Sequence, residues 1–146
     1  MITAWALVRF THVIFAVIWV GGQLTFSLVM IPLIQRRLKP ELAAGIRSTF
    51  GKMFGLFTLG VFLPVQAVTG YFLAAHRGVT WSNLLEPGYS RTLTTKLAVF
   101  LLVLLISGLH GYLHGSGRTT AARSLAVASL FGSVVIVLLA TALASF

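Results

Sequence analysis

The chain has 146 residues, of which 58% are hydrophobic and only 9% are charged, and its mean hydropathy is +0.97. About a quarter of the residues of a typical soluble domain are charged, so this composition excludes that class and indicates a chain that belongs in a lipid bilayer. The net charge of +9 does not indicate a nucleic-acid partner, because the lysines and arginines lie at the ends of apolar runs, where such residues anchor membrane helices.

Four apolar runs reach the roughly 20 residues needed to cross a hydrocarbon core of about 30 Å. We predict one all-α domain over residues 1–146, an integral membrane four-helix bundle with short loops. Its expected spans are 3–34, 53–75, 92–114 and 122–146. The first run is too long for the apolar part of a signal peptide, and we expect it to be retained. Residues 41–52 are expected to form a separate interfacial helix.

Positive charge is divided unevenly between the two sides of the predicted bundle. The first and third links carry seven lysines and arginines, and the opposite side carries four. The seven are Arg36, Arg37, Lys39, Arg47, Lys52, Arg118 and Arg123, and the four are Arg9, Arg77, Arg91 and Lys96. Because the richer side usually faces the cytoplasm, we expect a multi-pass protein of the cell membrane with both termini outside.

His12 stands at the head of the first apolar segment, THVIFAVIWVGGQ. An ionisable residue inside a membrane helix is costly, so it predicts a functional site. At 100° per residue, one stripe of this helix carries His12, Ala16, Trp19, Gln23, Phe26 or Ser27, and Met30. We expect this stripe to face protein rather than lipid, with Gln23 in an interhelical hydrogen bond.

Several other polar residues are predicted to lie in the same outer layer as His12. Counting about 1.5 Å of helix rise per residue places there His76, Lys96, Arg9, Arg77 and Arg91. Such a set suits haem b, because an imidazole ligates iron, apolar helices cover the ring, and basic side chains pair with the propionates. His12 is the expected axial ligand. The second ligand is His76 or Lys96, although Lys96 could instead serve a propionate and His76 could be a solvated residue at a helix end.

A second polar stripe is predicted on the third span. It carries Lys96, Phe100, Val103, Ser107, His110 and His114. His110 and His114 are roughly 20 Å or more from Lys96 by helix rise, so they belong to a different layer. An i, i+4 histidine pair could hold copper or zinc, one member could ligate a second haem, or both could anchor the helix end.

Three of the four spans resemble the membrane helices of HemJ-type protoporphyrinogen oxidases and CopD-type copper-resistance proteins. The similar segments are HVIFAVIWVGG (His12 to Gly22), FLPVQAVTGYFL (Phe62 to Leu73) and TTKLAVFLLVLLISGLHGYLH, which contains Lys96. In HemJ-type proteins the matching histidine and lysine are associated with haem b and activity. The fourth span differs, because the HemJ pattern has an Asn-Glu pair near its start and residues 122–146 contain no acidic residue.

The resemblance implies a haem b-binding membrane redox protein, either an electron-transfer protein or a haem-dependent oxidoreductase acting on a porphyrinogen or quinol-like substrate. The alternative is a CopD-like copper-binding or copper-transport protein. It would use four histidines, His12, His76, His110 and His114, as ligands. The expected surroundings are the lipid bilayer, with a possible second copy of the chain as partner. Without a cofactor, the sequence offers no paired carboxylate, serine nucleophile or phosphate loop for catalysis.

Overall fold

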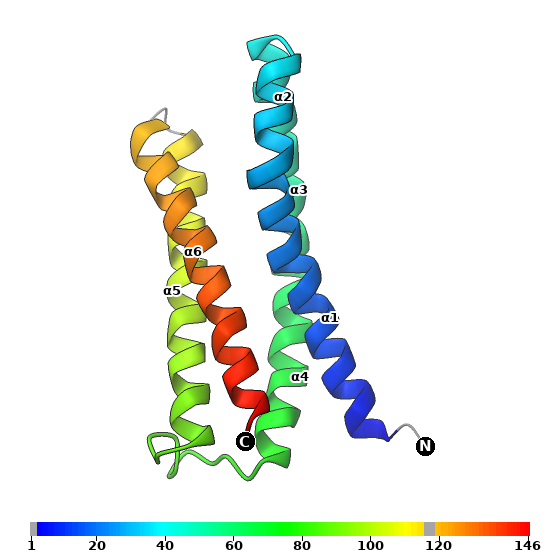
Figure 1. Cartoon of the computed structure of the whole chain (residues 1–146), viewed down its shortest axis with the longest axis vertical. Helices are drawn as coiled ribbons and strands as arrows, with labels where there is room; N and C mark the ends of the chain where they lie inside the picture. The colour runs from blue at the N-terminus through cyan, green and yellow to red at the C-terminus, as the bar shows by residue number, and fades with distance from the viewer. Residues whose placement is uncertain (1–2, 116–118) are drawn as a thin grey trace. The chain divides into compact units, whose positions relative to one another are not determined.

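The computed structural model describes residues 3–115 and 119–146, and the side chains of His114, Gly115 and Thr119 lie outside what it describes. Within this part of the chain the secondary structure is helical, without strands (Figure 1). The elements are α1 (Ala4–Thr25), η1 (Phe26–Met30), α2 (Ile31–Arg37), α3 (Pro40–Phe57), η2 (Thr58–Phe62), α4 (Leu63–His76), α5 (Tyr89–Gly115) and α6 (Thr119–Ala144). The expected all-α class is therefore confirmed.

Several of these elements join end to end, so the described part of the chain holds four helices long and apolar enough to cross a membrane. They cover Ala4–Arg37, Pro40–His76, Tyr89–Leu113 and Thr120–Ala144. The chain divides into two compact units, Met1–Gly78 and Val79–Phe146. We call the pair of long helices in the first unit the first hairpin, and the pair in the second unit the second hairpin, and describe each by itself.

The second long helix differs from its expected form. Residues 41–52 were expected to be a separate interfacial helix before a span beginning at residue 53, but Pro40–His76 is continuous. The expected boundary followed the last positive residue, Lys52. The helix continues past this position because Lys52 and Met53 are both good helix formers. Proline, the strongest helix breaker, does not occur between Pro40 and Pro64.

Both helices of the first hairpin contain a π-helical segment that ends two residues before a proline. In η1 the N–H of Ile31 donates to the carbonyl of Phe26, and Pro32 follows; in η2 the N–H of Leu63 donates to the carbonyl of Thr58, and Pro64 follows. A proline in a helix lacks an N–H and clashes with the carbonyl four residues earlier. The wider π turn, with its i to i+5 bond, lets each helix continue past its proline.

Aromatic contacts hold the two helices of the first hairpin together, and the two helices lie side by side in Figure 1. The Trp19 ring stacks on Phe62 with 4.7 Å between centroids, and its indole N–H donates to Thr58 Oγ1 at 3.0 Å. About two helical turns further along, Phe26 stacks on Phe50 at 3.5 Å between centroids. Trp19 is buried, so the predicted inward stripe of the first span is confirmed at its centre.

The second hairpin is formed by close packing of small and polar residues. Val103, almost fully buried, lies against Gly132, and a Cβ at Gly132 would overlap its side chain. The Ser107 and Ser129 hydroxyls are hydrogen-bonded at 2.6 Å. Near the other end the Tyr89 and Phe146 rings meet edge to face. The predicted stripe on the third span therefore faces α6, as small residues and interhelical hydroxyls do in membrane helix pairs.

Candidate functional site

The most specific polar arrangement in the first hairpin is centred on His12. Its Nδ1 lies 2.8 Å from Thr69 Oγ1, and that hydroxyl donates to the carbonyl of Val65 at 2.6 Å. A hydroxyl has one hydrogen, and a carbonyl oxygen only accepts. Thr69 must therefore accept the hydrogen of Nδ1–H. This assigns the neutral ring of His12 as the Nδ1–H tautomer, which carries its lone pair on Nε2.

Two further residues of α4 fix the position of His12. The side-chain amide of Gln66 donates to the backbone carbonyl of His12 at 2.7 Å, which locks α1 against α4 at this level. Gly70 lies beside the imidazole, and a Cβ there would be 3.3 Å from His12 Cε1. The ring is half-buried and directed toward α4 rather than outward.

Neither Thr69 nor Gln66 was among the predicted site residues. The signal that would have found them is the register of the hairpin. Trp19 pairs with Thr58 and Phe26 with Phe50, so partners lie at nearly equal distances from the turn at residues 38–39. Counting outward by the same rule brings His12 level with the polar residues of PVQAVTG.

His76 lies apart from His12. Its ring stacks on Trp5 with 3.9 Å between centroids, at the end of the hairpin, and the residue is exposed. Seven residues of α4 separate it from Thr69, which is about 10 Å of helix rise. The two histidines therefore do not occupy a common layer, contrary to the sequence expectation. Arg9 and Arg77, also expected there, are exposed.

Lys96 and Arg91 lie on α5, in the second hairpin. Lys96 is half-buried and Arg91 is exposed. The beginning of this helix is tied to the preceding loop by threonine hydroxyls, because Thr92 donates to the carbonyl of Gly88 at 3.0 Å and Thr94 to that of Leu84 at 2.8 Å. Lys96 therefore lies on a part of α5 that is hydrogen-bonded to the preceding loop.

Nδ1 of His110 is hydrogen-bonded to the neighbouring helix. That nitrogen lies 2.7 Å from the carbonyl of Ala122 on α6, so it carries a hydrogen and donates. Over residues 3–115 and 119–146, no group of three or more His, Cys, Asp or Glu side chains is placed to hold a metal ion. The predicted pair of His110 with His114 goes untested, because the His114 side chain is outside the described part.

An apolar groove was not predicted from the sequence. It has a volume of about 940 Å³ and lies between the α1–η1 segment and α3. Glycines on both sides, Gly21, Gly22 and Gly45, have no side chains to fill it. Glu41 is the acidic residue in its lining. The groove begins at Val17, more than a helical turn from His12, and His12 does not line it, so the groove is separate from the histidine site.

Comparison with known proteins gives one relative of undescribed activity. The chain is 37% identical over 101 residues to an uncharacterized protein of Aquifex aeolicus (strain VF5). The matched segment covers 69% of this chain and 64% of the relative, so the chain spans slightly less than two thirds of the relative's length. No protein-family description matches the chain, and no solved structure matches it.

Proposed function

We propose that this membrane protein binds haem b through Nε2 of His12 and acts in redox chemistry, as an electron-transfer protein or as an oxidase of a quinol-like or porphyrinogen substrate. The observation that carries the proposal is the hydrogen bond from His12 to Thr69. Haem-ligating and other metal-ligating histidines almost always donate their second ring N–H to a protein acceptor, which fixes the tautomer and orients the ring. Thr69 performs this role for His12.

The residues around His12 fit an axial ligand in other respects. Nδ1–H is committed to Thr69, so the lone pair is on the nitrogen that binds iron in most proteins. Gln66 holds the backbone of the same residue, and glycine at position 70 leaves room beside the ring. The resemblance of HVIFAVIWVGG to the first helix of HemJ-type proteins supports the same assignment.

We propose that Lys96 would hold the same haem, as a second iron ligand or as a propionate partner. The support is a depth count along each helix. Lys96 is seven residues from the beginning of α5, about 10 Å, and Gly70, beside His12, is six residues from the end of α4, about 9 Å. Both residues are therefore about equally far, along their own helices, from the connection at residues 77–88. His76, stacked on Trp5, is the weaker candidate.

When bound, haem b would supply the one-electron chemistry that the protein side chains lack. The contribution of the chain is to present a neutral imidazole of fixed orientation and to exclude water with apolar helices. The copper alternative would need several of the four histidines together. Over residues 3–115 and 119–146 there is no group of three or more such ligands, and the His114 side chain lies outside this part, so the copper alternative stays a prediction.

We further propose that both termini and the loop following His76 are outside the cytoplasm, on the basis of the seven-to-four division of positive residues. Enzymatic reporters fused after Phe146 test this. A reporter that works only outside the cytoplasm should be active in this fusion. Activity of a reporter that works only in the cytoplasm would show the opposite orientation.

The binding proposal is tested by the reduced-minus-oxidised absorption spectrum and a pyridine haemochrome assay of the purified protein. We expect a b-type spectrum in the wild type and its loss in His12→Ala. His76→Ala provides the matched control and should retain the spectrum. A b-type spectrum that persists in His12→Ala would remove His12 from the site.

A further inference from the structure

The turn between α2 and α3 reverses the chain within two residues. Leu38 (φ −118°, ψ 155°) and Lys39 (φ −61°, ψ 146°) are extended, and Pro40 begins α3. A backbone hydrogen bond lies on each side of the turn: Leu38 N–H donates to the carbonyl of Ile34 at the end of α2, and Ala43 N–H to that of Lys39 at the beginning of α3, both at 3.0 Å. So short a connection forces the end of α2 and the beginning of α3 into close contact.

A small cavity of about 200 Å³ lies at this contact. Its lining consists of Gln35, Leu38, Pro40, Ala43 and Arg47. The Nε atom of Arg47 is buried and has no hydrogen-bond partner among the described residues. A buried donor of a charged group without an acceptor is strongly unfavourable, so an acceptor supplied by a ligand would satisfy it.

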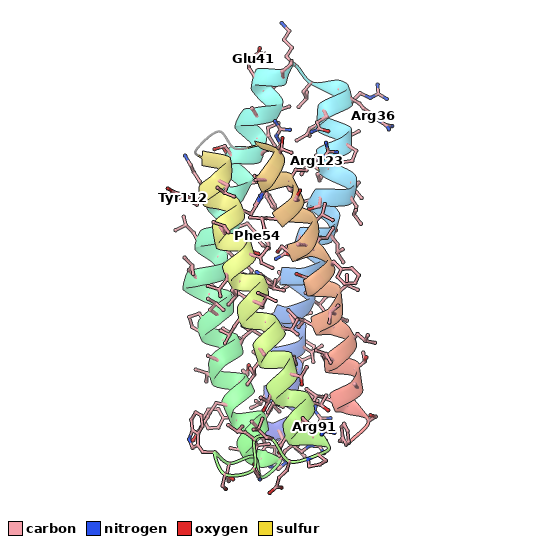
Figure 2. The ribbon with its side chains drawn as sticks, turned by 90° about the vertical axis from the view of Figure 1, so that its left-hand side faces the viewer. Arg36, Glu41, Phe54, Arg91, Tyr112 and Arg123 are labelled. Atoms are coloured by element: carbon pink, nitrogen blue, oxygen red, sulfur yellow. The ribbon has the colours of Figure 1, made fainter. Side chains whose placement is uncertain are left out.

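The charged residues around the cavity favour an anionic ligand. Residues 36–47 contain four positive side chains, Arg36, Arg37, Lys39 and Arg47, against the single carboxylate of Glu41. Figure 2 shows Arg36 and Glu41 at the tip of the first hairpin, one on α2 and the other on α3, with both side chains directed away from the helix pair. The cavity itself is lined by the cation Arg47 and the amide of Gln35, without a carboxylate.

The lengths of the two helices place this tip outside the hydrocarbon core, and Arg47, about 10 Å of helix rise below the tip, near the level of the lipid headgroups. The continuous helices have 34 and 37 residues, which correspond to about 51 and 55 Å. The hydrocarbon core is about 30 Å thick, so roughly 20 Å of the hairpin extends beyond it. The extension is at the α2–α3 end, because the charged residues are concentrated there.

We propose that the cavity between α2 and α3 binds the phosphate of an anionic phospholipid headgroup, with Arg47 and Gln35 as its donors. Nε and a terminal nitrogen of a guanidinium form the planar fork that bonds two phosphate oxygens at once, and the buried Nε of Arg47 is one prong of that fork. The neighbouring exposed cations add attraction for an anionic membrane surface. This site is independent of the haem proposal.

The test uses the full-length protein in detergent, with bound lipid counted by native mass spectrometry. The probe is phosphatidylglycerol, and diacylglycerol is the comparison without phosphate. We expect one preferred phosphatidylglycerol per chain and about tenfold weaker binding in Arg47→Gln. Arg123→Gln, which removes the same charge from an exposed position on α6, is the matched control and should bind within twofold of wild type.

Four results would overturn the proposal. Equal weakening in Arg47→Gln and Arg123→Gln would show attraction by net charge alone. Wild-type binding by Arg47→Lys would exclude the fork. Displacement of the lipid by inorganic phosphate at low millimolar concentration would assign the site to soluble phosphate instead. Where circular dichroism shows that Arg47→Gln has lost helix, Gln35→Leu is measured in its place, and unchanged lipid affinity in that variant would also contradict the assignment.

Discussion

His12 and Thr69 are 57 positions apart in the sequence, and their side chains are joined by a 2.8 Å hydrogen bond between α1 and α4. Because Thr69 donates its own hydrogen to Val65, the direction of this bond is fixed, and with it the tautomer of the imidazole. Helix packing and the tautomer of a candidate ligand are therefore set by the same contact.

Replacing Thr69 with valine should release the tautomer while conserving the shape of the side chain. In the haem-free protein, ¹⁵N NMR of His12 should change from one tautomer to a mixture. Haem affinity should fall about tenfold to a hundredfold, the usual effect of losing an outer-shell partner. Thr69→Ser keeps the hydroxyl and should resemble wild type. An unchanged tautomer in Thr69→Val would contradict the assignment, whether or not haem binds.

An alanine at position 70 should displace the imidazole. Its Cβ would lie 3.3 Å from His12 Cε1, so the ring must shift by a few tenths of an ångström. We expect haem affinity, measured by spectroscopic titration, to fall about tenfold. Gly55→Ala is the control, because a Cβ there meets nothing within 4 Å. Equal haem affinities of the two variants would show that the His12 imidazole can move aside without loss of binding.

Trp19→Phe removes the indole N–H donated to Thr58 but keeps an aromatic ring against Phe62. The variant should lose about 1 kcal/mol of stability, the usual net value of one hydrogen bond. Unfolding in mixed micelles with increasing dodecyl sulfate measures the change. Trp81→Phe, at a side chain that is 93% exposed, should differ from wild type by less than about 0.5 kcal/mol. Equal losses in both variants would contradict the packing described.

Gly132→Ala should separate α5 from α6. The new methyl group would overlap the Val103 side chain, and overpacking of this kind costs about 1–3 kcal/mol. The same unfolding assay detects the loss. Gly111→Ala, where a Cβ meets nothing within 4 Å, should cost nothing and provides the control. Adding Val103→Ala to Gly132→Ala should recover part of the stability, and a failure to do so would place the clash elsewhere.

The inward faces of the helices could be predicted because helical periodicity alone determines them. Trp19 on the first span, and Val103, Ser107 and His110 on the third, contact the neighbouring helix as their spacing indicated. Met30, counted on the same stripe as Trp19, is 38% exposed. The count of 100° per residue fails there because Phe26–Met30 is π-helical, and periodicity gives no sign of such a segment.

The interaction partners of the predicted site residues were harder to predict from the sequence than the helix faces on which these residues lie. His12 was identified as the central residue because an ionisable group in an apolar helix is costly. Its pairing with Thr69 depends on the register of two helices, which a two-residue turn sets and which single-helix periodicity does not contain. For the same reason His76 was placed level with His12, although it stacks on Trp5 at the end of the hairpin.

The two π segments also have a consequence for how homologous chains align. Each one accommodates about one residue more than an α-helical turn, so deleting a single position within Phe26–Met30 or Thr58–Phe62 would restore an unbroken α-helix. Because the π turn already absorbs that extra residue, the side chains beyond the deletion would keep nearly the same orientation relative to those before it. A one-residue gap within these ten positions therefore leaves the flanking helical segments in register, and relatives lacking Pro32 or Pro64 should carry such gaps.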